Sequence, residues 1–346
     1  MISKHSLRII IHKKLVVIYL FFKYRYQVLA TLLYLRKLKL NSIRLVLNLS
    51  SRNLIDYPPF IYPVLNTSIA AFNGRLVAVG RVSNARFEIG ADLIGRPIQL
   101  YRRQLSQLQN GIVKFDLSYD GVISNLEFLH NISTIPNFED PRICFFQGDA
   151  YVVMTQVTSP IGNAKTPFKS NLVIENVKTK QIVELPSPYF KGIEKNWVPV
   201  ENNESIVLLY GSNPVTLIQI EPTSSAHELI CTQNKSSINL NNRTQVIKTP
   251  HPEIPYIRVA SKKFAIRKYG YTPLHYFEIL TESMQPMNLS RPFVFSSRKQ
   301  EYCQGIAIID SKIYLSWSEQ EKYNYVGSIE IDEVIKLFDK RKVLRF

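Results

Sequence analysis

The sequence predicts an all-β fold, a five-bladed β-propeller with a basic helical extension at the N-terminus and a short helix at the C-terminus. From about residue 60 onward, short β-patterned runs alternate with turn signals, and no long helical periodicity interrupts them. A strand, turn and strand unit recurs there at intervals of roughly 50 to 75 residues, the size of a four-stranded blade. The chain of 346 residues is 45% hydrophobic, which is enough to fill a large core.

Five segments carry the recurring unit. In each, a short strand candidate (VLNTSIAA, RICFF, NWVPV, YIRV or GIAI) precedes a turn and a longer strand. The turns with their second strands are FNGRLVAVGRV (72–82), FQGDAYVVMTQV (146–157), ENNESIVLLYGSN (201–213), VASKKFAIRKYG (259–270) and IIDSKIYLSWSE (308–319). The first strand of each blade lines the central channel, so residues at the starts of these strands should meet at one mouth. These residues are Asn66, Glu139, Asp140, Arg142, Lys195, Asn196, Arg258 and Glu301.

Residues 1–52 form a region of their own, with 11 basic residues and no Asp or Glu. Its apolar runs, 15–22 and 28–35, are each shorter than the roughly 20 residues that span a bilayer, and Lys23 and Arg25 lie between them. The residues that follow the first run make a poor signal-peptide cleavage site. The pattern predicts basic amphipathic helices that either touch an anionic membrane surface or pack against the propeller, with a signal anchor as the remaining alternative.

The expected domains are therefore a helical extension (1–52), a catalytic propeller (53–338) and a basic tail (339–346). Near the end of the propeller, Ile331, Val334, Ile335 and Phe338 have helical spacing, which predicts a closing helix.

Charge and cysteine content narrow the class of protein. The net charge is +16, but residues 1–52 supply +11 of it, which leaves too little on the propeller for a DNA-binding face. Cys144, Cys231 and Cys303 have neither zinc-site nor disulfide-framework spacing, which favours a reducing, cytoplasmic location, with peripheral membrane contact through the extension. No phosphate-binding loop, GxSxG or HExxH motif is present. We expect no metal and no cofactor, and no nucleic-acid partner.

Several segments resemble a known group of enzymes. They are EDPR (139–142), EKNW (194–197), LLYGSNP (208–214), YTPLHYFEIL (271–280) and QEYCQGIAIIDSKIYLSW (300–317). They resemble the five-bladed propeller carbohydrate enzymes, above all the β-mannoside phosphorylases and hydrolases of glycoside hydrolase family 130 and the related β-1,2-mannosyltransferases. The resemblance covers roughly residues 60 to 335. It implies a carbohydrate substrate and an enzyme that makes or breaks a β-mannoside-like bond with inversion.

The resemblance implies that Asp140 is the general acid. Inversion needs a carboxylic acid to protonate the leaving oxygen and a nucleophile on the opposite face of the sugar ring. On an extended strand the adjacent Glu139 and Asp140 point to opposite sides, so they are not a catalytic pair. Arg142, two residues after Asp140, is expected on the same side as Asp140, and Glu139 is expected to have a structural partner.

The resemblance also implies a site for the second substrate. Lys195 stands where the phosphorylases carry a Lys that contacts the anionic nucleophile, and Arg81 and Arg142 are candidates for the same anion. Convergence of the three would indicate phosphate or a sugar phosphate as substrate. Otherwise water or an acceptor sugar takes that place, with Glu301 or Glu194 as base. The phosphorylases usually carry a longer, more acidic motif where this chain has EKNWVP, and this departure favours glycosyl transfer.

Substrate contacts are expected from Asn66, Asn196, Arg258 and His275, and His275 resembles a family position near the sugar hydroxyls. Several of the candidate site residues also have a purely structural interpretation. Asp140 would be a strand-start carboxylate paired with Arg142, and Lys195 and Asn196 would solvate a blade edge. Glu301 would be a rim charge, and His275 a core histidine. A non-catalytic propeller that binds glycan or protein is the alternative function.

Overall fold

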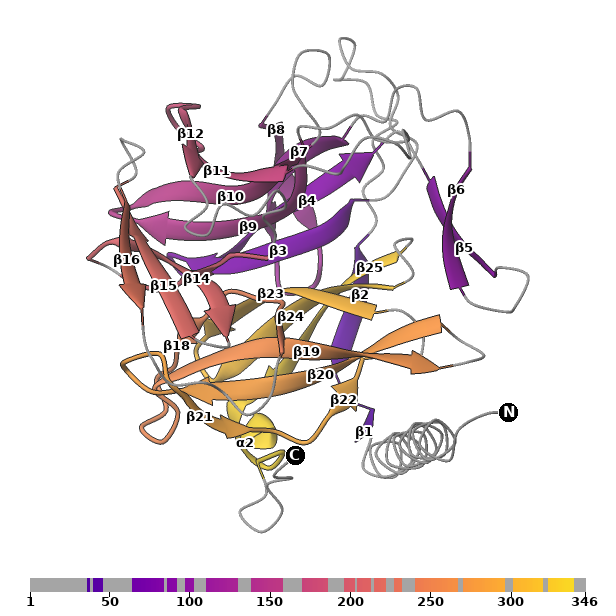
Figure 1. Ribbon diagram of the computed structural model, residues 1–346. Helices are drawn as coiled ribbons and strands as arrows, with labels where there is room; N and C mark the ends of the chain where they lie inside the picture. The colour runs from indigo at the N-terminus through magenta and orange to yellow at the C-terminus, as the bar shows by residue number, and fades with distance from the viewer. Residues whose placement is uncertain are drawn as a thin grey trace, which may run out of the picture.

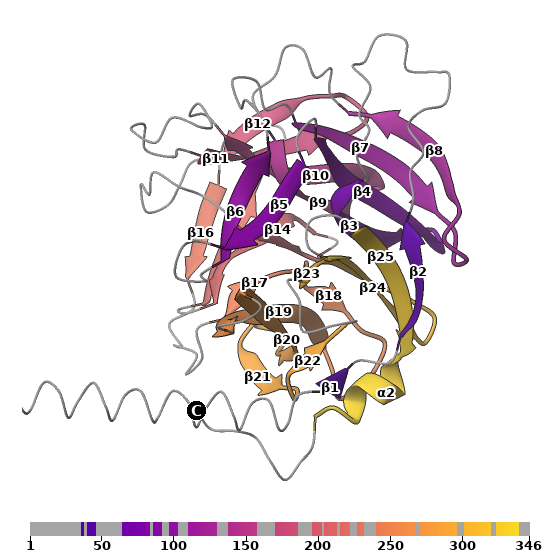
Figure 2. The same cartoon turned by 90° about the vertical axis from the view of Figure 1, so that its right-hand side faces the viewer.

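The computed structural model confirms a five-bladed β-propeller (Figures 1 and 2). In both views the sheets follow one another around a central axis, with the indigo-to-magenta blades on one side and the orange-to-yellow blades opposite. The structure describes residues 36–37, 40–45, 64–83, 86–91, 97–102, 110–129, 138–157, 170–185, 196–202, 204–212, 215–221, 227–231, 240–266, 270–295, 301–319 and 323–338.

Blades 1 to 3 are antiparallel sheets whose strands run outward from the axis in chain order. Blade 1 consists of β3 (Leu65–Phe72), β4 (Arg75–Ser83), β7 (Asn110–Leu117) and β8 (Ile123–Phe128). Blade 2 consists of β9 (Phe138–Phe146), β10 (Asp149–Val157), β11 (Ser170–Asn176) and β12 (Ile182–Leu185). Blade 3 consists of β13 (Val198–Val200), β14 (Ile206–Ser212), β15 (Val215–Ile220) and β16 (His227–Cys231). A separate hairpin, β5 (Arg86–Ala91) and β6 (Pro97–Arg102), is inserted between β4 and β7.

Blade 4 differs from the expected strand order. Its inner edge consists of two short segments, β17 (Asn241–Asn242) and β18 (Ile247–Lys248), which both pair with β19 (Tyr256–Ile266). The YIRV segment, expected as the inner strand, therefore lies in the second strand. The blade continues with β20 (Gly270–Leu280), β21 (Pro286–Leu289) and β22 (Phe293–Val294), and β1 (Arg36–Lys37) pairs with β22.

Blade 5 contains strands from both ends of the described chain. Its sheet order is β23 (Glu301–Ile309), β24 (Lys312–Glu319), β25 (Tyr323–Glu330) and β2 (Asn41–Leu45). The antiparallel pairing of β2 with β25 runs from Asn41 opposite Ser328 to Leu45 opposite Asn324. Residues 36–37 and 41–45 were expected in a helical extension, so a boundary at residue 52 does not separate that extension from the propeller. The rest of 1–52 and the 339–346 tail lie outside the described residues.

The C-terminal helix was predicted correctly. Helix α2 (Ile331–Ile335) follows β25 directly and buries Ile331 and Val334. Among the described residues no helix is long and apolar enough to cross a bilayer.

The hydrophobic core lies between neighbouring blades, because each sheet buries a face against the next one. Val79 and Ile143 meet between blades 1 and 2. Trp197 packs edge-on against Tyr210 at 5.0 Å in the cluster between blades 2 and 3, and Trp317 stacks on Phe295 at 4.6 Å between blades 4 and 5. Trp197 is 2% exposed, so its role is packing between the blades.

Polar contacts close the ring between blades 5 and 1. Ser316 Oγ donates to the carbonyl of Thr67 at 2.5 Å, and the Asn324 amide donates to the Thr67 hydroxyl. Gly305 lies so close to β3 that a Cβ at this position would be 2.4 Å from the backbone nitrogen of Ile69. The inner strands of these two blades therefore approach each other more closely than any side-chain-bearing residue at position 305 would permit.

Candidate active site

The starts of three inner strands carry backbone irregularities at one end of the channel. Asn66, Asp140 and Asn196 have φ angles of 52°, 50° and 64°, in the left-handed region where Asn and Asp are the most tolerated side chains after glycine. The pairing register shifts at Asn66 between β3 and β4, and at Asp140 between β9 and β10. Such bulges at strand ends re-aim side chains. Asn66, Asp140 and Asn196 thus mark one mouth of the propeller.

Asp140 is partly exposed at this mouth and held by neighbouring blades. The Asn66 amide Nδ2 donates to Asp140 Oδ1 at 2.9 Å. Asn66 Oδ1 in turn accepts from Ser318 Oγ at 3.2 Å, so blade 5 orients the amide and the amide orients the carboxylate. The arrangement leaves Asp140 reachable from solvent with one oxygen fixed, as a proton donor to a bound substrate needs.

Glu139 and Asp140 contact different partners, as expected, and the partners of Glu139 include Arg81. Glu139 Oε1 lies 3.8 Å from Arg81 Nη1, and the two side chains are 15% and 5% exposed. Arg81, expected as an anion ligand, therefore contacts the carboxylate adjacent in sequence to Asp140, between blades 1 and 2.

Two buried guanidinium groups lie close enough to Asp140 for electrostatic interaction. Arg142 is 1% exposed, and its Nη1 donates to the carbonyl of Pro141 at 2.9 Å. Burial lowers the pKa of Arg142 to about 10, and the Asp140 charge opposes that shift. Burial also lowers the pKa of Arg243, again against the charge of Asp140. Both groups stay protonated at neutral pH, so two positive charges accompany one carboxylate.

Arg243 is held from blades 4 and 5. Its Nε donates to Ser261 Oγ at 2.5 Å, and its guanidinium carbon lies 5.0 Å from the centre of the Tyr302 ring. Sequence reasoning missed Arg243 because the inner edge of blade 4, NNRTQVIK (241–248), has no strand-like alternation. The sequence offered one hint in that segment, a basic residue at the spacing at which the repeat predicts the start of an inner strand.

The structure places Arg258 in the interior of blade 4, not at the mouth. It is 1% exposed, and its Nε donates to Glu278 Oε2 at 2.7 Å. Its Nη1 donates to Asn242 Oδ1 at 2.6 Å, and Asn242 Nδ2 donates to the backbone carbonyl of Asn196 at 3.1 Å. Because Arg258 lies in the second strand of the blade, it is connected to Asn196 at the mouth through Asn242.

His275 and Glu301 are both buried between blades 4 and 5. His275 Nε2 accepts the backbone N–H of Cys303 at 3.3 Å, and its ring packs edge-on against Phe295 at 4.9 Å. Burial, with a smaller effect from the Arg243 charge, lowers the pKa of His275 to about 3, so it is neutral. Glu301 Oε2 accepts the backbone N–H of Phe295 at 2.8 Å. The geometry is that of a core histidine and a buried backbone-binding carboxylate.

Lys195 and Glu194 lie outside the described residues, so their expected roles remain predictions. Asn196 directly follows them at the same mouth. In the described part of the chain no group of three His, Cys, Asp or Glu side chains is placed to bind a metal ion.

The insertion that contains β5 and β6 begins on the Asp140 side of the propeller. It follows β4, which runs antiparallel to β3 and ends opposite the start of β3, with Arg81 beside Leu65.

No protein-family model matches the chain, and no curated protein matches its sequence. Solved structures with the same fold include a glycosyl hydrolase from Bacteroides ovatus (12% identity, TM-score 0.50, covering 78% of this chain and 84% of that one). A β-1,2-mannobiose phosphorylase from Listeria innocua has 11% identity and a TM-score of 0.51, covering 86% and 99%. A mannose phosphorylase from Leishmania mexicana has 10% identity and a TM-score of 0.51, covering 88% and 92%. The resemblance to five-bladed propeller carbohydrate enzymes is thus confirmed for the fold.

Proposed function

We propose that this protein is a carbohydrate-active enzyme that makes or breaks a β-mannoside-like glycosidic bond with inversion, with Asp140 as the general acid. The observation that carries the proposal is the partly exposed Asp140 carboxylate at the propeller mouth, fixed by Asn66 beside the charges of Arg142 and Arg243. The propeller fold supports it further, since proteins of this fold include the two phosphorylases named above.

In the proposed reaction Asp140 donates its proton to the glycosidic oxygen while the bond from that oxygen to the anomeric carbon breaks. A nucleophile forms the new bond from the opposite face of the ring, which inverts the configuration. The Asn66 amide donates to Asp140 Oδ1 and so orients the carboxyl group that gives up the proton. Asn66 is thus a positioning residue.

Phosphate is the nucleophile that the electrostatics favour over water. Two guanidinium groups against one carboxylate leave a net positive charge, and arginine forks match phosphate oxygens. Water would need a base. Among the described carboxylates near Asp140, Glu139 pairs with Arg81 and Glu301 accepts a backbone N–H in the interior. We therefore propose phosphorolysis, or its reverse from a sugar 1-phosphate, with Lys195 as a further phosphate ligand and hydrolysis as the alternative.

The test supplies purified protein with a β-mannoside in water, with the same mannoside plus phosphate, and with mannose 1-phosphate plus an acceptor sugar. Phosphate-dependent release of an α-configured sugar 1-phosphate is the expected result, and equal turnover without phosphate would assign hydrolysis instead. Asp140→Asn should reduce turnover by roughly 100- to 10,000-fold. Asp310→Asn, in an exposed turn of blade 5, is the matched control. Unchanged turnover in Asp140→Asn would reject the assignment of the acid.

A further inference from the structure

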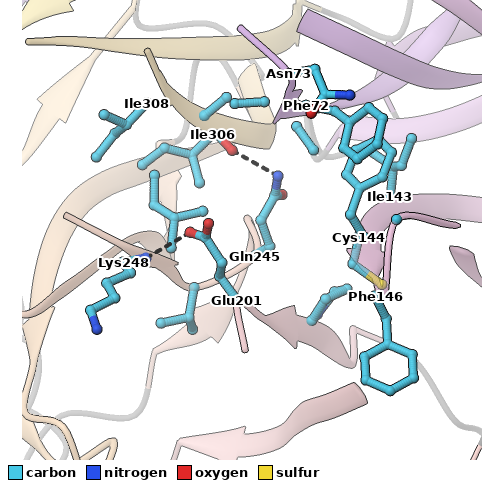
Figure 3. A pocket seen from close by; sticks show the side chains of 18 of the residues that line it. Phe72, Asn73, Ile143, Cys144, Phe146, Glu201, Gln245, Lys248, Ile306 and Ile308 are labelled. Atoms are coloured by element: carbon cyan, nitrogen blue, oxygen red, sulfur yellow. Dashed lines mark hydrogen bonds between the residues drawn. The ribbon is translucent and has the colours of Figure 1, made fainter. Parts of the chain in front are cut away.

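A cavity opens at the end of the channel away from Asp140, and Figure 3 shows the residues that line it. Its volume is about 330 Å³, near the lower end of the range for small-molecule sites. It is lined by the last residues of β3, β9 and β23, whereas Asp140 stands near the start of β9. Neither Asp140 nor the neighbouring Arg142 and Arg243 is among the residues that line the cavity.

Gln245 lies in the interior of the ring and lines the cavity. Its side chain is buried, and Nε2 donates to the carbonyl of Ile306 at 2.7 Å and to that of Ile69. Ser68 Oγ lies 3.5 Å from Gln245 Oε1 and donates to it. One amide from blade 4 thus joins the inner strands of blades 1 and 5 beside the cavity that it helps to line.

The wall contributed by blades 1 and 2 is aromatic. The rings of Phe72 and Phe145 stack with their centres 4.2 Å apart and their planes 9° apart, and both side chains are partly exposed. Phe146 and Ile308 add further apolar surface to the lining. Aromatic faces of this kind attract organic cations as well as apolar groups, because the ring face is electron-rich.

One acidic side chain faces these rings across the cavity. Glu201 Oε2 accepts the backbone N–H of Lys248 at 2.9 Å, while the Lys248 ammonium group points away from the carboxylate (Figure 3). The other carboxylate oxygen has no hydrogen-bond partner within the described residues. The Glu201 side chain is exposed, so a ligand in the cavity can reach its carboxylate. The protein atoms around it raise its pKa, and the Lys248 backbone N–H and charge oppose that shift.

We propose that this cavity binds a small organic cation, an ammonium group carried on an apolar body. The ammonium group donates to Glu201, and the body lies against the Phe72–Phe145 pair. The stacked rings offer the apolar body a flat surface, and the exposed Glu201 carboxylate is an acceptor for the ammonium group. This inference does not depend on the proposed enzymatic function, because the cavity lies at the end of β9 and Asp140 near its start.

The experiment titrates the full-length protein calorimetrically with benzylammonium and, separately, with benzyl alcohol, which has the same body without the charge. The expected result is at least tenfold tighter binding of benzylammonium. Glu201→Gln should remove that preference, and Glu330→Gln, an exposed carboxylate on blade 5 beside Lys312, should retain it. Phe145→Leu should weaken both ligands by roughly severalfold.

Equal affinity for the two ligands, an unchanged preference in Glu201→Gln, or no measurable binding of benzylammonium to the wild type would each overturn the proposal. Tighter binding of methyl mannoside than of benzylammonium would overturn it in favour of a carbohydrate site. Unfolding midpoints of the variants, measured in the same buffer, show whether a lost signal reflects lost folding. If Glu201→Gln does not fold, Phe145→Leu together with the charged and neutral ligand pair still decides.

Discussion

The buried arginines of this protein illustrate how the contacts of one side chain separate structure from function. The Arg258 guanidinium group donates hydrogen bonds to Glu278 and Asn242, which both lie in blade 4. Arg142 is equally buried, but its one hydrogen bond within the described residues goes to the carbonyl of Pro141, and its Nε has no partner there. Arg142 is therefore a buried cation whose charge acts on Asp140, whereas Arg258 is held in an ion pair inside blade 4.

Arg258→Met should destabilise the protein, because it leaves the Glu278 carboxylate buried without its cation. Breaking one side of a buried pair costs about 3 to 5 kcal/mol. The double variant Arg258→Met/Glu278→Met should recover much of that loss, since neither charge then remains. Urea unfolding of the three proteins measures both quantities. A stable Arg258→Met with a raised KM for sugar would instead assign Arg258 to substrate binding.

His275 should make the protein less stable in acid. Burial lowers the pKa of His275 to about 3, below the roughly 6.5 of an unfolded chain, so below pH 6.5 the unfolded state takes up a proton that the folded state excludes. Its contribution is full above pH 6.5 and falls by about 1.4 kcal/mol per pH unit toward pH 3. His275→Gln retains an acceptor for the Cys303 N–H and should flatten this dependence.

Urea unfolding at several pH values between 7 and 4 checks this expectation. The relevant quantity is the difference in unfolding free energy between wild type and His275→Gln at each pH, because other titrating groups cancel in it. His251→Gln, in the turn before β19, controls for the loss of a histidine outside the core. A difference that does not change with pH would contradict the neutral, buried state of His275.

Among the elements, the inner strands determine where the candidate site lies. In blades 1 and 2 these strands begin with a bulge at Asn66 or Asp140 and become apolar only from Ile69 and Ile143 onward. The bulge, rather than simple strand alternation, aims Asp140 at Asn66. The inner edge of blade 5 has a different constraint, because Gly305 lies against Ile69 of the neighbouring strand.

Gly305→Ala should lower stability by about 1 to 3 kcal/mol, the usual cost of inserting a methyl group where no space exists. The added Cβ would stand 2.4 Å from Ile69 nitrogen and 2.6 Å from Ser316 Oγ, so strands β23 and β3 would have to separate. Thermal unfolding monitored by far-UV circular dichroism measures the loss. An unchanged midpoint would show that the seam between blades 5 and 1 is looser than described.

Sequence patterns predicted the strands with regular alternation and failed where that regularity ends. The hairpins of blades 1, 2, 3 and 5 were located correctly, and the EDPR segment led to Asp140. In blade 4 the inner edge is two residue pairs separated by Arg243 to Val246, and no periodicity marks so short an element. The next strand was therefore mistaken for the inner one. That single shift explains both the misplaced Arg258 and the missed Arg243.

At the scale of the whole molecule, ring closure was also not predictable from local patterns. NSIRL (41–45) follows a basic, apolar region without acidic residues, and composition alone favoured helix. The segment is a strand because β25 is the last strand described and its free edge takes a partner from the other end of the chain. Burial of Glu301 and His275 likewise depends on how blades 4 and 5 pack, which sequence spacing does not report.

Deletion of residues 1–45 should lower the unfolding temperature by at least about 5 °C relative to deletion of residues 1–35. The longer deletion removes β2 and exposes the edge of β25, where Ile43 stands opposite the buried Val326. The shorter deletion retains the strand and serves as the matched control. Equal midpoints for the two truncated proteins would show that β2 contributes nothing to closure.

The split origin of blade 5 has a consequence for biosynthesis. A ribosome delivers β2 among the first strands and β25 as the last, so the early strand waits without its neighbour while nearly all of the chain is made. Even the Asn324–Thr67 contact at the same seam joins residues 257 positions apart. Closures between such distant segments are slow, and an unpaired edge invites aggregation in the meantime. We expect nascent chains that stall before Tyr323 to need chaperone protection, even when blades 1 to 4 have already folded.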